Sequence, residues 1–132
     1  MIRLIVVEDQ PAVRKGLKMR LSAEADLSVV GEAEDGAAVL DLAKVISPDV
    51  VLLDVEMPHL DGIRTAKALH AICPQVAIIM LSIYDDALTR AQAAEAGAAA
   101  FVAKTLPTDV LLSTIRQVAS SGYGRVSGSR LP

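Results

Sequence analysis

The chain has 132 residues, of which 52% are hydrophobic and 22% are charged, and its formal net charge is −3. This length suits one domain, and the composition is typical of a globular protein rather than a disordered one. The acidic balance argues against a nucleic-acid surface, and an aromatic content of 2% offers no platform for stacking bases. A single cysteine excludes an internal disulfide and a Cys-rich zinc site.

The sequence also lacks membrane signals. No apolar run approaches the roughly 18 residues of a membrane-spanning helix. The first ten residues lack the longer apolar region and the cleavage site of a signal peptide. We therefore expect a cytoplasmic protein that makes no contact with a membrane.

Short apolar runs alternate with longer segments of helical spacing along the chain. The runs occupy residues 4–7, 27–30, 50–53, 76–81 and 99–103. Continuous apolar runs of this length are typical of strands that are buried on both faces of a parallel sheet. Three of the intervening segments place apolar residues on one helical face, at Val13, Leu17 and Leu21; at Val39, Leu42, Ala43 and Ile46; and at Leu111, Ile115 and Val118.

Prolines and a glycine mark the ends of the expected helices. Pro11 stands where a first helical turn begins, and Pro107 precedes the last helix. Pro48 ends the second helix, and Gly97 caps the fourth, which we expect at about 86–96. Five strand–helix pairs predict one α/β domain over residues 1–121, a doubly wound (βα)5 fold with a five-stranded parallel sheet. The Gly-, Ser- and Arg-rich residues 122–132 predict a linker or tail.

Polar side chains follow four of the predicted strands. Glu8 and Asp9 follow the first strand, Asp54 ends the third, Ser82 follows the fourth and Lys104 ends the fifth. Ligands of open α/β sheets bind beyond the carboxyl ends of the strands, so we expect these side chains to meet at one rim. Taken alone, each has a plainer interpretation: the acid pair as the start of a helix, Asp54 as a loop acid, Ser82 as a helix N-cap and Lys104 as a solvated lysine.

Taken together, these residues favour phosphoryl chemistry. Three neighbouring carboxylates repel one another unless a cation joins them, and a ligand set made of oxygen atoms favours Mg²⁺. A carboxylate can attack a phosphoryl group and hold it as an aspartyl phosphate. A lysine and a metal would neutralise the phosphoryl oxygens, and a serine hydroxyl would donate a hydrogen bond to them.

Residues 2–121 resemble the receiver domains of two-component response regulators, the CheY-like, flavodoxin-like family. Four segments carry the resemblance: Val7-Glu8-Asp9-Gln10, Asp54-Val55-Glu56-Met57-Pro58 with Asp61-Gly62, Leu81-Ser82, and Phe101-Val102-Ala103-Lys104. The chain looks more like the NarL/FixJ subgroup, whose members carry a DNA-binding helix-turn-helix after the receiver. Residues 124–127 are similar to the entry of that subgroup's linker, which implies a second domain that is absent from this sequence.

The resemblance implies that Asp54 accepts a phosphoryl group from a histidine kinase, and that the metal is Mg²⁺ or Mn²⁺. It also assigns the neighbours: metal ligands at Glu8, Asp9, Asp54 and the backbone carbonyl of Glu56, and phosphoryl contacts from Lys104 and Ser82.

The resemblance further implies a conformational switch. Phe101 matches the family's switch aromatic, which turns inward when Ser82 moves, although core packing is the better interpretation from the sequence alone. Phosphorylation would reshape the surface of the fourth helix, fifth strand and fifth helix and promote homodimerisation through it. The output is then transcription, with DNA bound only through the absent domain. On this interpretation the chain is a phosphoacceptor switch and not an enzyme.

Two features depart from the family's pattern. The family often follows its lysine with a cis proline, whereas Thr105 follows Lys104 here, and a cis bond before threonine would cost about 3 kcal/mol. Glu56 and Tyr84 occupy the two positions that, in the family, tune how fast the phosphoryl group is lost. The sequence leaves that lifetime open.

Three alternatives stay open at this stage. A phosphohydrolase with an aspartyl-phosphate intermediate would use Asp54 as nucleophile and Glu56 as general acid/base, although the chain has no cap domain. A flavodoxin-like cofactor binder would need a phosphate loop after the first strand, where Glu8 and Asp9 would repel a phosphate. A pseudo-receiver would bind partners without being phosphorylated.

Overall fold

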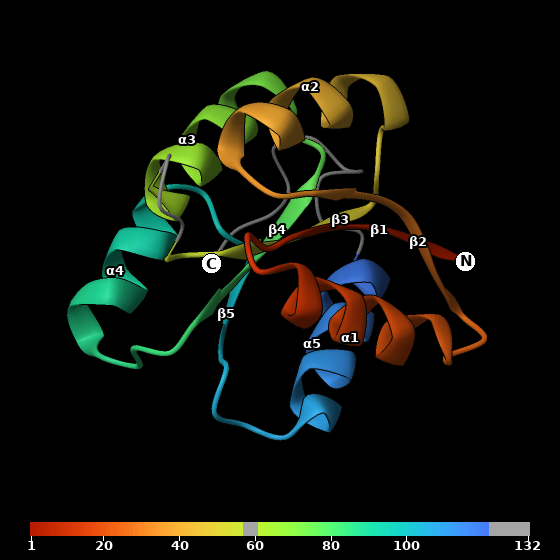
Figure 1. The fold of residues 1–132 in the computed structure, drawn as a ribbon. Helices are drawn as coiled ribbons and strands as arrows, with labels where there is room; N and C mark the ends of the chain where they lie inside the picture. The colour runs from red at the N-terminus through yellow and green to blue at the C-terminus, as the bar shows by residue number, and fades with distance from the viewer. Residues whose placement is uncertain (57–60, 122–132) are drawn as a thin grey trace.

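The computed structural model describes residues 1–56 and 61–121, and in this part five parallel strands form one sheet with helices on both of its faces (Figure 1). The strand order is β2-β1-β3-β4-β5. The elements are β1 (Ile2–Val7), α1 (Pro11–Ser22), β2 (Leu27–Ala33), α2 (Gly36–Ile46), β3 (Val50–Asp54), α3 (Gly62–Ile72), β4 (Ala77–Ser82), α4 (Ala87–Glu95), β5 (Ala100–Ala103) and α5 (Thr108–Ser120). The predicted doubly wound (βα)5 fold is confirmed. The predicted linker at 122–132 and the Met57-Pro58 part of the motif lie outside the described residues.

Two apolar layers bury the sheet on its opposite faces. Alternate residues of β1 serve opposite layers: Ile5 and Val7 belong to the layer under α2, α3 and α4, whereas Leu4 and Val6 belong to the layer under α1 and α5 (Figure 1). A strand covered on both sides has no polar face, which explains why the strands are continuous apolar runs in the sequence.

The ends of the helices follow the predicted signals. Pro11 is the first residue of α1. Ser47 ends α2 in the left-handed conformation, with φ 55°, just before Pro48. Gly97 follows α4 with φ +101°, and a Cβ at this position would lie 2.5 Å from the ring of His70. A glycine is therefore needed there for both its backbone conformation and its small size.

Two details differ from the sequence expectations. β2 runs to Ala33 rather than stopping near residue 30, because it lies at the edge of the sheet, where the half-buried Gly31 and the exposed Glu32 are tolerated. Val13, expected on the buried stripe of α1, is 45% exposed. It borders a hollow between α1 and the segment that joins β5 to α5, so the sheet does not cover it.

Arg116 of α5 joins that helix to the turn between α1 and β2. Its guanidinium lies 2.7 Å from Glu24 Oε1 and 2.9 Å from Asp26 Oδ2. The hydrogen bonds from Arg116 hold the pKa of both carboxyls below their ordinary values. The stability that these contacts contribute is present above the ordinary carboxyl pKa and is lost as the pH falls through the depressed values.

We therefore expect Arg116→Gln to make the protein less sensitive to acid. Between pH 7 and about pH 3.5, the urea midpoint of the wild type should fall further than that of the variant. Arg64→Gln, at an exposed position of α3, is the matched control and should track the wild type. Equal acid losses in the wild type and Arg116→Gln would contradict the assignment.

No helix within the described ranges is long and apolar enough to cross a membrane.

Candidate functional site

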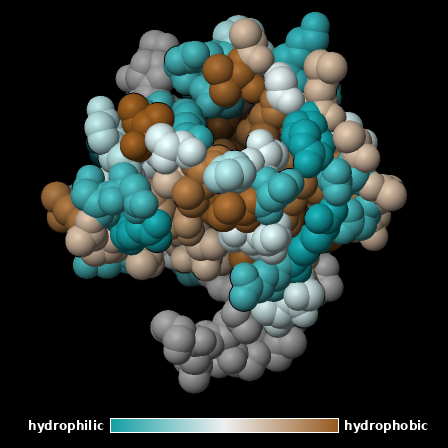
Figure 2. All heavy atoms as spheres, turned by 90° about the horizontal axis from the view of Figure 1, so that it is seen from below, coloured by the Kyte–Doolittle hydropathy of each residue, from teal (hydrophilic) through white to brown (hydrophobic). Residues whose placement is uncertain are grey.

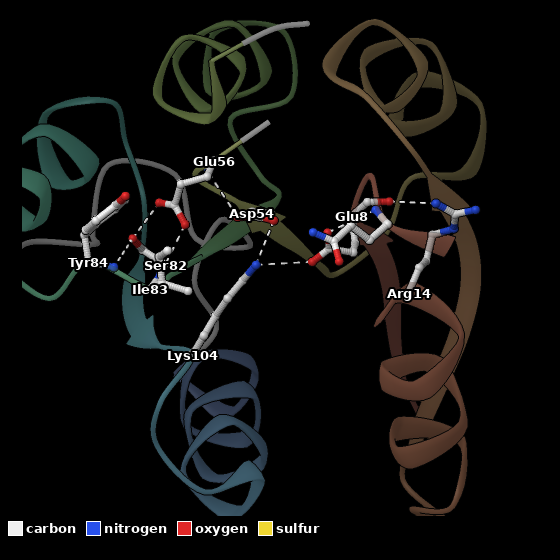
Figure 3. A network of polar contacts seen from close by, with 9 residues as sticks. Glu8, Arg14, Asp54, Glu56, Ser82, Ile83, Tyr84 and Lys104 are labelled. Carbon is white, nitrogen blue, oxygen red and sulfur yellow. Dashed lines mark hydrogen bonds and ion pairs between the residues drawn. The ribbon is translucent and has the colours of Figure 1, made fainter. Parts of the chain in front are cut away.

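The carboxyl ends of four strands bring the predicted polar residues to one rim of the sheet (Figure 3). β1 ends just before Glu8, β3 ends at Asp54, β4 ends at Ser82, and β5 ends just before Lys104. The strand ends are tied together, because the Lys104 amide donates to the Ser82 carbonyl at 2.8 Å. The structure thus gathers these side chains where the sequence placed them, and their chemical roles stay predictions.

Lys104 lies between two buried carboxylates. Its Nζ is 2.7 Å from Asp54 Oδ2 and 3.2 Å from Glu8 Oε1, while Asp54 is only 3% exposed and Glu8 4%. Burial lowers the pKa of Lys104, but the hydrogen bonds and charges of Asp54 and Glu8 outweigh burial and leave that pKa above its ordinary value. Lys104 is therefore a fixed positive charge beside Asp54 and not a solvated lysine.

The backbone and a helix hold Glu8 in place. The Gln10 amide donates to Glu8 Oε2 at 3.2 Å, and Arg14 Nη1 donates to the Glu8 carbonyl at 2.7 Å. Burial raises the pKa of the Glu8 carboxyl, with further increases from a hydrogen bond with Asp9 and from the charge of Asp54. Arg14 was not among the predicted site residues. Its position in the first turn of α1, shortly after Glu8 in the sequence, is the signal that could have identified it.

Three carboxylates form a group that fits a metal ion. Single oxygen atoms of Glu8, Asp9 and Asp54 all lie within 4.8 Å of one another. All three donors are hard oxygen atoms, and besides burial and a hydrogen bond with Asp9, the nearby charge of Asp54 raises the pKa of the Glu8 carboxyl. This donor set matches Mg²⁺, which takes a few carboxylates and keeps part of its water shell.

The Ser82 hydroxyl lies in a hydrogen-bond network that the sequence did not predict. Ser82 Oγ donates to Glu56 Oε2 at 2.6 Å and accepts from the Tyr84 amide at 2.9 Å (Figure 3). Glu56 Oε1 also accepts from the Ile83 amide at 3.2 Å. The N-cap interpretation of Ser82 is wrong, because Ser82 ends β4 and the side chain of Asp86 caps α4.

The two other predicted residues of this region are Tyr84 and Phe101. The Tyr84 side chain is 56% exposed, and its backbone amide is the part that contacts Ser82. Phe101 is half-buried and packs against the core layer under α4. The Arg90 guanidinium lies over its ring, 4.7 Å from the centroid, and Arg90 Nε bonds Asp85 at 2.5 Å. This cation–π contact gave no signal in the sequence.

Gly62 gives the site close backbone packing. A Cβ at Gly62 would lie 2.4 Å from the Asp54 carbonyl oxygen and 2.6 Å from Val55 Cα. Both neighbours are backbone atoms that cannot rotate away. Any side chain at Gly62 must therefore displace the segment that carries Asp54.

We expect Gly62→Ala to lower the free energy of unfolding by about 1–3 kcal/mol, as overpacking does. Gly16→Ala is the control, because nothing lies within 4 Å of a Cβ there. Within helix α1 that change should stabilise by about 0.5–1 kcal/mol. Urea unfolding of both variants tests the pair, and equal effects of the two changes would show that Gly62 is not sterically required.

The peptide bond after Lys104 is trans, since no bond in the described ranges is cis.

A hollow of about 310 Å³ lies beside Lys104, between α1 and the β5–α5 segment. Its walls are mainly apolar, with Val13, Leu106 and Leu111 among them, and Glu8 also lines it. On the face formed by α1 and α5, apolar side chains lie among hydrophilic ones (Figure 2).

The chain matches a known family over most of its length. The family model named 'Response regulator receiver domain' matches residues 4–116 of the sequence. The chain is 36% identical over 118 residues to the uncharacterized transcriptional regulatory protein YxjL of Bacillus subtilis, covering 89% of this chain and 54% of that protein. It is 40% identical over 103 residues to the protein described as the transcriptional regulatory protein NarL of Mycobacterium tuberculosis, covering 78% and 48%.

The fold has a close match among solved structures. The signal receiver domain of the response regulator NarL from Mycobacterium tuberculosis superposes with a TM-score of 0.84 and 35% identity, covering 90% of this chain and 96% of that domain. The chain spans about half the length of the curated relatives it matches.

Proposed function

Because this chain belongs to the response regulator receiver domain family of two-component systems, we propose that it switches when Asp54 accepts a phosphoryl group from a histidine kinase. The observation that carries the proposal is the setting of Asp54. Its carboxylate is buried, lies 2.7 Å from Lys104 Nζ and shares a compact group with two further carboxylates. A buried aspartate beside a fixed cation and a metal-type oxygen cluster suits phosphoryl transfer.

The transfer step is a substitution at phosphorus. A carboxylate oxygen of Asp54 forms the new P–O bond, and the P–N bond of the phosphohistidine breaks, leaving its electron pair on the imidazole nitrogen. Lys104 offsets the negative charge brought to the rim, and Ser82 donates a hydrogen bond to a phosphoryl oxygen. Glu8, Asp9, Asp54 and the backbone carbonyl of Glu56 would hold Mg²⁺ or Mn²⁺, which supplies positive charge to the phosphoryl oxygens when it is bound.

The state of this switch would be passed to the surface of α4, β5 and α5. Phe101 on β5 is the switch aromatic of this proposal, and Glu56 and Tyr84 tune the lifetime of the phosphoryl group. The phosphorylated receiver would form a homodimer through this surface. Since similar proteins are transcriptional regulators, the output would be transcription in the cytoplasm, with DNA bound by a domain outside this sequence.

The hydrolase alternative needs the Glu56 carboxylate as an acid/base beside Asp54. That carboxylate is instead bonded to Ser82 and to the Ile83 amide. An acid/base role for Glu56 would first require those two hydrogen bonds to break, so the geometry of this structure favours a receiver over a hydrolase.

Acetyl phosphate with Mg²⁺ tests the proposal. The intact mass of the wild type should rise by about 80 Da, the mass of one phosphoryl group. Reduction with borohydride converts an aspartyl phosphate to homoserine, and peptide mass spectrometry should locate that change at Asp54. An absent adduct would support the pseudo-receiver instead, and an adduct at another residue would refute the assignment of Asp54.

A further inference from the structure

The Ser82 hydroxyl already uses its single proton in a hydrogen bond to Glu56. Ser82 is 0% exposed, donates to Glu56 Oε2 at 2.6 Å and accepts from the Tyr84 amide at 2.9 Å. A hydroxyl has a single proton to donate. Ser82 can therefore donate to Glu56 or to a phosphoryl oxygen, but not to both.

Glu56 ties the phosphoacceptor to the end of β4. Its backbone amide donates to Asp54 Oδ1 at 3.0 Å, while its carboxylate takes the Ser82 hydroxyl and the Ile83 amide (Figure 3). The 2.6 Å distance from Ser82 Oγ falls in the range of charge-assisted O–H···O⁻ bonds, which are about twice as strong as neutral ones. Glu56 thus holds both polar groups at the end of β4 through one charged side chain.

We infer that Glu56 is a positioning residue that stabilises the resting state by competing with the phosphoryl group for the Ser82 hydroxyl. This inference rests on the proposed function. A phosphoryl group on Asp54 brings nearly two negative charges next to the Glu56 backbone, so its carboxylate is repelled as Ser82 is attracted. Activation therefore includes the exchange of one acceptor for another at Ser82.

The same exchange releases the segment that leads into α4. Ile83 loses its carboxylate partner when Glu56 leaves, and α4 begins at Ala87, four residues later. Ala93 is the buried residue that anchors α4, and the helix is otherwise mostly exposed. A weakly anchored helix responds to a small change at its N-terminal end.

Beryllofluoride with Mg²⁺, a mimic of the phosphoryl group, provides the probe. We expect Glu56→Ala to bind it about 10-fold more tightly than the wild type, since the competing charge-assisted bond is gone. Glu56→Gln should show a smaller gain in affinity than Glu56→Ala, because its amide oxygen can still accept from Ser82 and compete with the mimic. Some gain should remain, since a single amide oxygen holds the Ile83 amide less firmly than the carboxylate does. Isothermal titration calorimetry measures both, with Glu95→Gln on exposed α4 as a control that should match the wild type.

A double-mutant cycle separates competition at Ser82 from simple charge repulsion. In a Ser82→Ala background, the gain from Glu56→Ala should shrink to less than half of its wild-type value on a free-energy scale. An equal gain in both backgrounds would mean that Glu56 acts by charge alone and would overturn the inference. No gain, or weaker binding, in the wild-type background would also overturn it.

The resting state offers a readout that does not depend on the mimic. In a two-dimensional NMR spectrum, the Ile83 amide proton of Glu56→Ala should move upfield because its carboxylate acceptor is missing. An unmoved resonance would contradict the inference. If the wild type itself failed to bind beryllofluoride at Asp54, the proposed function would fail first, whereas normal wild-type binding with no effect of Glu56 would refute this inference alone.

Discussion

Asp54→Ala is expected to abolish labelling by acetyl phosphate, with no mass adduct under conditions that label the wild type. Alanine offers no oxygen to form the P–O bond. Asp54→Asn should behave in the same way, because it keeps the shape of the side chain and loses the nucleophilic carboxylate.

The fold should survive both changes, which keeps the result interpretable. Lys104 retains Glu8 as a partner at 3.2 Å, and the repulsion between Glu8 and Asp54 is removed. Circular dichroism should therefore show cooperative melting in both variants. Asp41→Asn, at an exposed position of α2, should label like the wild type. An adduct of equal yield on Asp54→Ala would place the phosphoryl group elsewhere and remove the basis of the proposed function.

Much of the fold could be predicted because its signals are local. A strand buried on both faces needs a continuous apolar run, and Pro11, Pro48 and Gly97 act through their own backbone geometry. β2 was harder to bound, since at an edge the partner strand maintains the pairing while Gly31 and Glu32 break the apolar run. The exposure of Val13 depends on how the β5–α5 segment borders α1, which the helical spacing of the sequence cannot predict.

The rim could be predicted because topology, and not side-chain detail, brings its members together. Every strand of a parallel sheet ends on the same side, so residues that end strands converge whatever their rotamers. The contact between Glu56 and Ser82 depends instead on which strands are neighbours. β3 pairs directly with β4, which sets a residue just beyond Asp54 against the end of β4. Knowledge of the strand order would have been needed to anticipate that hydrogen bond.

The removal of Mg²⁺ is the second change for which we expect complete loss of labelling. Glu8, Asp9 and Asp54 carry three negative charges in their ionised forms, and Lys104 offsets one of them. The remaining negative charge repels a phosphoryl donor, which is itself anionic, and a divalent cation at the three oxygens would cancel that repulsion. Excess EDTA should therefore leave the intact mass of the wild type unchanged after incubation with acetyl phosphate.

Metal binding should also be visible without any phosphoryl donor. A ligand that binds the folded state alone stabilises it by RT ln(1 + [L]/Kd), which is about 2.7 kcal/mol at 100 times Kd. Mg²⁺ should thus raise the melting temperature of the wild type, and Asp9→Asn should reduce that rise because it removes one of the three carboxylates. Asp41→Asn serves again as the control and should keep the full rise. Labelling that persists in EDTA, together with a melting temperature indifferent to Mg²⁺, would show that Lys104 alone makes the rim tolerate the phosphoryl group.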